Sequence, residues 1–232
     1  MRPVNDTVCA PATPIGAGAV SIIRVSGEDA LNVVDKVIIF KNGTASDSKG
    51  YSVKFGTVRG DIDDVLVTIF RAPHSYTGED GVEISCHASS YVVSRILELL
   101  TAAGARMAAP GEFTQRSFVN GKMDLAQAEA VADLIASTSE ASHRVARNQL
   151  KGAYSAELKE LRDKLLELAA LLELELDFSE EDVEFADRTE LRLLLEEASA
   201  HICRLTESFR TGNAVKNGVP VAIVGAVNSG KS

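Results

Sequence analysis

The chain has 232 residues, 45% of them hydrophobic and 25% charged, so it can bury a sizeable core and is long enough for more than one domain. Its formal net charge of -9 argues against nucleic-acid binding driven by overall charge, so any RNA contact must be local or shared with a partner. Three widely spaced cysteines indicate neither a disulfide framework nor a zinc site, and no apolar run is long enough to span a bilayer. These features are typical of a cytoplasmic protein with no membrane role.

The first quarter of the chain predicts two strands and a helix. Residues 7–10 and 19–25 read as strands on either side of a segment rich in Pro and Gly. The second run is almost wholly apolar, as in a buried central strand, yet it contains Arg24. This arginine needs an anionic or carbonyl partner, and the local sequence favours an internal salt bridge and a ligand contact about equally. Residues 26–29 then supply capping and acidic residues for a helix whose apolar face is Ala30, Val33, Val34 and Val37.

A hairpin and a further strand are predicted next. Residues 51–59 and 64–70 form the hairpin around Gly60-Asp61, and a loop rich in special residues follows at 72–80. In the following strand Val82, Ile84 and Cys86 alternate with Glu83 and Ser85, which therefore share the opposite face. Taken alone, Glu83 is best interpreted as a residue that faces water. A helix over 89–103 ends this part, with Gly104 as its stop.

From about residue 121 the pattern becomes helical. Asp124 and Gln127 have the character of a capping box for a helix towards Ser137, and a second helix is predicted over 139–150. Leucines then repeat at spacings of mainly three and four, from Leu158 to Leu176, and predict one seam of a long helix. An acidic break at 177–184 separates it from a last helix that carries leucines from Leu191 to Leu205. Residues 121–210 should pack as a helical bundle, followed by a polar hinge at 211–218.

Two histidines lie on these predicted helices. His143 and His201 have no neighbours at metal-ligand spacing, so they are interpreted as ordinary helix residues.

The chain ends in a phosphate-binding motif. An apolar run rich in β-branched residues leads into Gly225, and Gly230, Lys231 and Ser232 complete G-x-x-x-x-G-K-[ST]. Glycines let successive backbone N–H groups wrap a nucleotide's phosphates, Lys231 would reach the β and γ phosphates, and Ser232 would offer its hydroxyl to Mg²⁺. The alternative is a chance match in a turn, which the preceding predicted strand disfavours.

Three segments together resemble one known family, and so does the order of the parts. The segments are ATPIGAG at 12–18, SYTGED at 75–80 and PGEFTQRSFVNGKMDLAQAEA at 110–130. They are similar to the tRNA-modifying GTPase family MnmE, also called TrmE. In that family a folate-binding α+β domain, similar to the glycine-cleavage T-protein, precedes a helical domain and a G domain. The resemblance implies an α+β fold with domains at 1–120 (folate binding and dimerisation), 121–217 (helical) and 218–232 (the first strand and phosphate loop of the G domain).

The resemblance also implies a function and partners. Family members form a homodimer through the N-terminal domains and work with the flavoprotein MnmG (GidA) on the wobble uridine of certain tRNAs. A one-carbon unit from a tetrahydrofolate derivative, 5-formyl- or methylene-tetrahydrofolate, becomes part of the C5 substituent (carboxymethylaminomethyl), and GTP hydrolysis drives the process with Mg²⁺ and K⁺. We therefore expect a K⁺-activated GTP hydrolase in the whole protein.

Site residues are carried over by matching motifs. The folate-contacting positions become Arg24, Glu83 and Lys122, and no catalytic residue is assigned within the chain. Asn228 matches a K⁺-binding asparagine, and Ser232 matches the Mg²⁺ residue. The GTP-binding positions are Asn228, Ser229, Gly230, Lys231 and Ser232.

The chain departs from the family pattern at three places, and two other functions compete. Val227 replaces a proline, Ala88-Ser89 replaces Gly-Gly after His87, and Ser179 replaces a proline. The first change should alter loop stiffness, and the second concerns close approach of the backbone or a ligand.

The competing functions are a folate-dependent enzyme of the aminomethyltransferase type, which the phosphate loop disfavours, and a folate-binding dimerisation scaffold without catalysis of its own.

Overall fold

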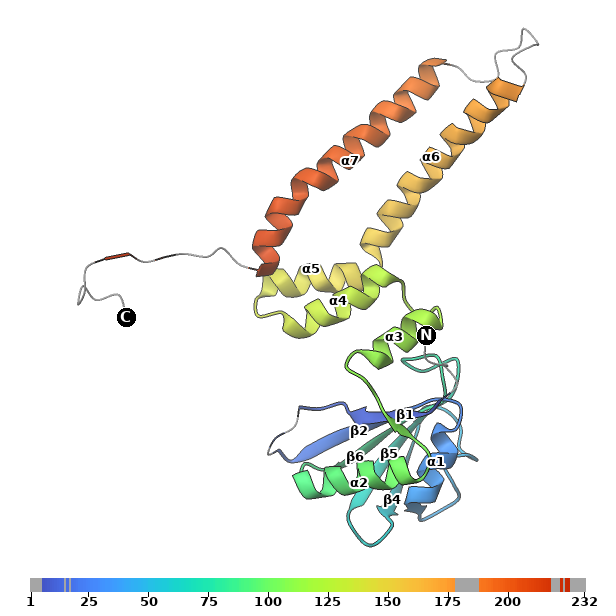
Figure 1. The fold of residues 1–232 in the computed structure, drawn as a ribbon, viewed down its shortest axis with the longest axis vertical. Coiled ribbons are helices and arrows are strands. Elements are labelled where there is room, and N and C mark those ends of the chain that lie inside the picture. Colours follow the sequence, from blue (N-terminus) through green and yellow to red (C-terminus); the bar gives the residue numbers. More distant parts are fainter. Residues whose placement is uncertain are drawn as a thin grey trace. The chain divides into compact units, whose positions relative to one another are not determined.

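The computed structural model describes residues 6–14, 16, 18–177, 188–217, 222, 224 and 225. The chain divides into two compact units, Met1–Met123 and Asp124–Ser232. Among the described residues, the first contains a seven-stranded sheet with three helices, and the second contains four helices (Figure 1). The predicted α+β fold class is confirmed.

The sheet of the first unit is almost entirely antiparallel. Its strands lie in the order β3-β4-β5-β6-β2-β1-β7, and only β1 and β7 run parallel. The strands, in chain order, are β1 (Val8–Pro11), β2 (Val20–Ser26), β3 (Ile38–Phe40), β4 (Ser52–Val58), β5 (Asp64–Phe70), β6 (Gly81–His87) and β7 (Arg106–Met107). The predicted hairpin is therefore β4 and β5, and β2 is central, as its apolar sequence indicated.

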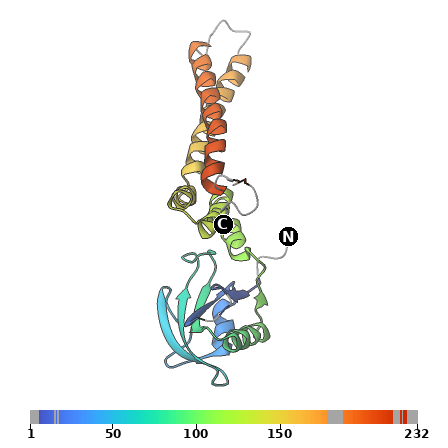
Figure 2. The ribbon, with the colours of Figure 1, turned by 90° about the vertical axis from the view of Figure 1, so that its left-hand side faces the viewer.

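Helices α1 (Ala30–Val37) and α2 (Ser90–Ala102) cover one face of this sheet (Figure 2). The buried residues of the strands alternate with exposed ones, and Ile23, Ile84 and Val67 stand opposite one another in register on the buried face. Each has no exposed surface, and burying such a side chain stabilises the fold by about 1.5–3 kcal/mol. Neither α1 nor α2 covers the opposite face. It holds Arg24 and Glu83, which are cross-strand partners.

A third helix, α3 (Glu112–Val119), closes the first unit. The sequence singled out this segment without predicting a helix, because its buried residues, Arg116 and Ser117, are polar. The short strands β3 and β7 were also not predicted. Strands of two or three residues are too short to show an alternating pattern.

The second unit contains α4 (Leu125–Ala136), α5 (Glu140–Leu150), α6 (Ala153–Asp177) and α7 (Arg188–Asn217). The predicted capping box is confirmed, because Asp124 accepts a hydrogen bond from Gln127 N at 2.8 Å and the Gln127 side chain accepts one from Asp124 N at 2.9 Å. Ser139 forms an equivalent box with Ser142 at the start of α5. Side chains of Gln127 and Gln149 then join α4 to α5.

Two expectations about the helices are corrected. The polar hinge predicted at 211–218 is wrong, because α7 continues to Asn217; one glycine at 212 costs about 1 kcal/mol, which a long helix tolerates. The leucine seam of α6 is buried at Leu168, at 8% exposed, whereas Leu158, Leu165 and Leu172 are about 40% exposed. The acidic break lies mostly outside the described residues.

Candidate functional site

Two of the three predicted folate residues line a small pocket on the face of the sheet away from α1 and α2. Its volume is about 70 Å³. It is lined by residues of β2, the end of β5, the start of β6 and the loop between those two strands: Arg24, Val25, Ser26, Phe70, Ser75, Tyr76, Thr77, Gly81, Val82 and Glu83. Two of the three predicted residues, Arg24 and Glu83, lie in this pocket.

Arg24 and Glu83 form an ion pair across neighbouring strands. Arg24 donates from Nε at 3.0 Å and from Nη2 at 2.7 Å, both to Oε1 of Glu83. Each side chain is about a quarter exposed. Of the two partners considered for Arg24, the internal carboxylate is the one present here, and Glu83 faces this arginine as well as solvent. Oε2 of Glu83 accepts no hydrogen bond from any residue that the structure describes.

The guanidinium of Arg24 also lies against two aromatic rings. Its Cζ is 5.1 Å from the ring centre of Tyr76 and 5.5 Å from that of Phe113. Both distances are within the range of a cation–π interaction. Sequence reasoning missed both aromatic residues, although each belongs to a segment that it had marked as unusual. They place a flat apolar surface next to a charged pair.

Helix α3 holds the loop that forms one wall of the pocket. Ser117 Oγ donates to the carbonyl of Tyr76 at 2.6 Å, and Asn120 Nδ2 donates to the carbonyl of Thr77 at 2.8 Å. The hydroxyls of Tyr76 and Thr114 are 2.9 Å apart. The loop is therefore fixed by hydrogen bonds along its backbone, and the pocket wall depends on α3.

A buried arginine joins α3, this loop and the start of the chain. The side chain of Arg116 is 6% exposed, and its Nη1 donates to Glu79 Oε1 at 3.1 Å and to the carbonyl of Asp6 at 2.8 Å. Its Nη2 reaches Glu112 at 3.1 Å and the carboxylate of Asp6. Buried charges persist only when they are paired in this way. Sequence reasoning missed this role of Arg116.

The same network lowers the pKa of two of its carboxyl groups, those of Glu112 and Asp6. The pKa of Glu112 falls to about 2, first because Arg106 donates a hydrogen bond to it, with further donation from Ala109 N and Arg116. Arg106 likewise lowers the pKa of Asp6, which is also bonded to Arg116. Glu79, the partner on the loop, accepts from Ser26 Oγ at 2.7 Å. Its charge thus links the pocket strand β2 to α3 through Arg116.

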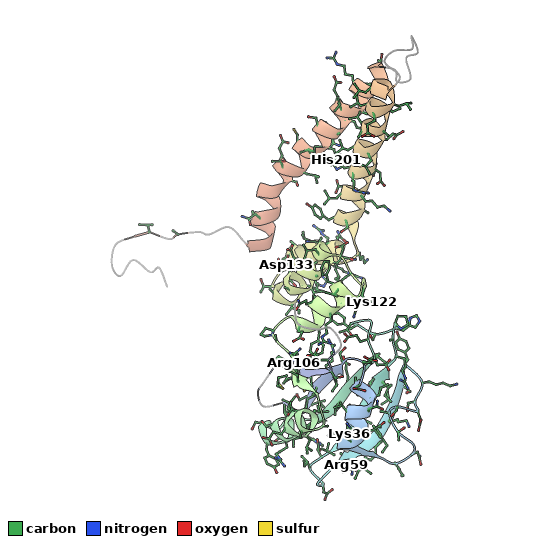
Figure 3. The ribbon with its side chains drawn as sticks, turned by 45° about the vertical axis from the view of Figure 1, so that its right-hand side comes forward. Lys36, Arg59, Arg106, Lys122, Asp133 and His201 are labelled. Carbon is green, nitrogen blue, oxygen red and sulfur yellow. The ribbon has the colours of Figure 1, made fainter. Side chains whose placement is uncertain are left out.

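Lys122 lies outside this pocket. It comes from the turn after α3 (Figure 3), and its Nζ donates to the carbonyl of Pro73 at 2.9 Å. Its stem passes Gly78, since a Cβ at that glycine would lie 3.2 Å from Lys122 Cγ. Lys122 therefore contacts the same loop as the pocket residues, but it is absent from the pocket lining.

A larger groove, of about 690 Å³, lies along α1. It contains none of the predicted site residues, and its Asp35 is already engaged, because it accepts from Ala45 N at 2.6 Å and Ser46 N at 3.1 Å.

In the described part of the chain, no three His, Cys, Asp or Glu residues are grouped as metal ligands. The helices described there include none long and apolar enough to cross a membrane.

The histidines of the second unit differ in their surroundings. His201, labelled in Figure 3, lies on α7 with Nε2 3.2 Å from Glu157 Oε1 of α6, and His143 is exposed on α5.

The predicted GTP residues Asn228, Ser229, Gly230, Lys231 and Ser232 lie outside the described residues, so the phosphate loop stays a prediction from sequence.

Two family models match the chain in succession. The N-terminus of the GTP-binding protein TrmE matches residues 7–122, and the MnmE helical domain matches residues 125–220. The junction between the two matches falls where the two compact units meet.

Curated relatives agree with this match. The chain is 57% identical to the tRNA modification GTPase MnmE of Bacteroides thetaiotaomicron over 98% of its own length and 50% of the relative's. It is 56% identical to the protein of the same name from Bacteroides fragilis and 52% identical to that of Parabacteroides distasonis, again over 98% of the chain. The chain spans about half the length of these relatives. It therefore belongs to the MnmE (TrmE) family.

Proposed function

We propose that the whole protein is a tRNA modification GTPase, and that the unit Met1–Met123 binds a tetrahydrofolate derivative at the Arg24–Glu83 pocket. The observation that carries the folate part is a carboxylate with one oxygen that has no hydrogen-bond donor among the described residues, beside an arginine and two aromatic rings. The family membership supports the GTPase and the tRNA substrate, which the relatives' names state.

The chemistry of the pocket suits a pterin. A pterin ring presents adjacent N–H donors that a carboxylate such as Glu83 accepts in pairs, and its flat surface matches the faces of Tyr76 and Phe113. Folate's glutamate tail and carbonyls suit cations such as Arg24 and Lys122. When bound, the folate would supply a one-carbon unit for the C5 substituent of the wobble uridine.

The volume of the pocket requires side chains to move when a ligand enters. Ligand pockets usually enclose about 300–1,000 Å³, whereas this one encloses about 70 Å³. We expect the Arg24 side chain to move, because it lies between Glu83 and the two rings. Binding would release Arg24 from Glu83 Oε1 and leave the carboxylate to the ligand.

A folate titration tests this part. Glu83→Gln, Arg24→Ala and Lys122→Ala should each weaken the affinity for 5-formyl- or methylene-tetrahydrofolate, with Glu83→Gln the most affected because it loses the charge that accepts the N–H pair. Glu98→Gln, an exposed carboxylate on α2, is the matched control and should bind as the wild type does. Unchanged affinity in all three site variants would overturn the folate proposal.

The GTPase part rests on the phosphate-loop sequence. Asn228 would bind K⁺, Ser232 would bind Mg²⁺, and Ser229, Gly230 and Lys231 would bind the phosphates of GTP. GTP hydrolysis by the full-length protein should be faster in K⁺ than in Na⁺, and Asn228→Ala should abolish that difference. Hydrolysis that is independent of K⁺ would count against the role of Asn228.

A homodimer through the N-terminal unit and cooperation with the flavoprotein MnmG in the cytoplasm complete the proposal. The uncovered sheet face supports the homodimer, because Phe55 and Leu66 are cross-strand partners there and are 50% and 51% exposed. Phe55→Glu with Leu66→Glu should shift the molar mass measured by light scattering to that of a monomer. A retained dimer would show that another surface pairs the two copies.

These tests also distinguish the proposed function from two other functions. A folate-dependent enzyme of the aminomethyltransferase type would bind folate and hydrolyse no GTP. A dimerisation scaffold would bind folate and pair, yet take no part in tRNA modification. The folate titration and the GTPase assay together separate these two from the proposed function.

A further inference from the structure

Helix α5 carries a row of cationic side chains on its exposed side. Arg144, Arg147 and Lys151 are all exposed, and His143 lies beside them. At 3.6 residues per turn the four positions fall within roughly 100° of the helix circumference and extend over about 12 Å of its length. Lys151 is the C-cap residue of the helix, so the row runs to its C-terminal end.

The row lies on the side of α5 that faces away from α4. Residues on the packed side of α5 are buried or half-buried: Ser142, Ala146, Gln149 and Leu150. Gln149 Nε2 donates to the carbonyl of Ala126, and Leu150 O accepts from Gln127 Nε2, so this side is fixed against α4. The cationic side is therefore held in place by the packing of the other side.

No carboxylate in the described part of the chain forms an ion pair with these cations. Arg144, Arg147 and Lys151 take part in none of the described ion pairs, although Glu140 lies one turn before Arg144. By contrast, Lys164 on α6 is bonded to Glu197 at 2.6 Å and to Glu160 at 3.4 Å. Within the described residues, the cations of α5 are thus not paired with carboxylates.

The rest of the unit makes this row exceptional. From residue 124 to residue 232 the chain has 12 Lys and Arg against 20 Asp and Glu. The row has three cations and one neighbouring carboxylate, Glu140, in an otherwise acidic unit, so its local positive charge can attract a polyanion. With a net charge of -9, RNA contact must be shared with a partner or occur through a local face such as this row.

We propose that the cationic row of α5, formed by Arg144, Arg147 and Lys151, is a docking surface for the phosphate backbone of the tRNA substrate. The inference rests on the proposed function, which brings a tRNA to this protein. An RNA is favoured over an acidic protein because the row has no apolar centre, with Ala146 buried beneath it, and phosphate contacts need none. Such contacts position the RNA and do not read its sequence.

The test measures binding of a fluorescently labelled tRNA transcript to the chain as a function of KCl concentration. Each phosphate contact contributes about 0.7–0.9 to the slope of log affinity against log salt. Arg144→Ala/Arg147→Ala/Lys151→Ala should therefore reduce that slope by about 2–3 and weaken binding about tenfold or more at 50 mM KCl. Arg144→Lys/Arg147→Lys keeps the charges and should keep the slope.

A second triple variant controls for net charge. Lys159→Ala/Arg162→Ala/Arg204→Ala removes three exposed cations from α6 and α7 and should leave the slope nearly unchanged. An equal effect of the two triple variants would overturn the proposal, and so would unchanged binding of the α5 variant. Far-UV circular dichroism of each variant verifies the helix content.

Two further outcomes also count against the α5 surface. If poly-L-glutamate displaces the tRNA at equal concentration of charge, the row binds acidic polypeptides instead. If the wild-type chain binds no tRNA, the row has no such role. The folate titration and the GTPase assay do not involve α5, so they report on the proposed function independently of either result.

Discussion

Arg24 lies in the middle of an apolar strand, where an unpaired charge would be costly. The fold compensates by placing Glu83 directly opposite on β6 and two aromatic rings above the guanidinium. The same contacts that stabilise Arg24 also arrange a carboxylate, a cation and a flat apolar surface in one pocket. A residue that looks structural in the free protein is thus also suited to bind a ligand.

Arg116 has a different role, since its nearly buried guanidinium is paired with three carboxylates. It fixes the loop beside the pocket and the start of the chain to α3. The effect of this network on the free energy of unfolding should be clearest at Glu112, whose side chain is 12% exposed.

Glu112 should make the protein sensitive to acid. Its pKa is lowered from an ordinary value of 4.5 to about 2, so the stabilisation is complete above pH 4.5 and is lost as the pH falls towards 2. The shift corresponds to about 3 kcal/mol of free energy of unfolding. Glu112→Gln should flatten the dependence of urea unfolding on pH between 5 and 2.5, besides lowering stability at pH 7.

The exposed carboxylate of Glu98 provides the comparison. It pairs with Arg95 on the surface of α2, and exposed pairs contribute about 0–1 kcal/mol. Glu98→Gln should retain the wild-type pH dependence. An unchanged pH dependence in Glu112→Gln as well would show that its ion pairs do not stabilise the fold.

Gly78 is constrained both by its backbone and by its neighbours. Its φ is +81°, and a Cβ would lie 3.2 Å from Lys122 Cγ and 3.3 Å from Asn120 Cβ. Gly78→Ala should lower the free energy of unfolding by about 1–2 kcal/mol for the left-handed conformation, with an additional loss from displaced contacts. Chemical denaturation of the variant measures the total loss in the free energy of unfolding.

A substitution at Gly121 separates the cost of the left-handed backbone from the cost of displaced contacts. Its φ is +70°, and nothing lies within 4 Å of the position of a Cβ. Gly121→Ala should therefore show the backbone cost alone. Equal losses for the two variants would mean that the loop yields to the extra methyl group without cost.

At the level of elements, the ends of α4 and α5 are fixed by their own first residues. Both helices begin with a capping box, and the one at Asp124 follows the junction of the two matched family domains. Capping satisfies backbone N–H groups that have no partner within the helix. The start of α4 is thus determined locally.

Asp124→Ala should lower the stability of the helical unit by about 1 kcal/mol. Asparagine caps a helix as well as aspartate does, so Asp124→Asn should retain most of the stability. Thermal unfolding followed at 222 nm compares the three proteins. A loss in Asp124→Asn as large as in Asp124→Ala would indicate that the charge matters, and not the cap.

Elements with a strong period or a cap could be predicted from the sequence. The alternation in β5 and β6 and the Asp124 capping box carry their own signals, and the structure confirms them. Helix α3 has no such signal, because its buried residues are an arginine and a serine that satisfy tertiary partners. The end of α7 was mispredicted because polar composition alone does not end a helix.

The site was predictable in its residues and not in its contacts. Motif resemblance pointed to Arg24 and Glu83, which lie 59 residues apart in the chain, but their pairing depends on the register of β2 and β6. The contacts of Arg24 with Tyr76 and Phe113 depend on how α3 fixes the loop. Sequence spacing contains no information on either arrangement.

The two units differ in how completely they bury their apolar residues. In the sheet unit a continuous core joins the strands to α1 and α2, with many side chains fully buried. In the helical unit, Leu165 is 40% and Leu172 41% exposed, and Leu168 is the buried member of that seam. Local stability follows the burial of apolar groups and the protection of backbone hydrogen bonds. The units should therefore open with different free energies.

Hydrogen–deuterium exchange of the chain should display this difference. Amides of β2 and β6 should exchange most slowly, because both strands have partners on each side and bury one face against α2. Amides of α6 between residues 158 and 176 should exchange at least tenfold faster, since their helix buries few apolar groups. Mass spectrometry of peptic peptides resolves the two regions. Equal protection of α6 and β6 would show that the leucine side of α6 is covered in solution, contrary to the exposure of Leu165 and Leu172 in the structure.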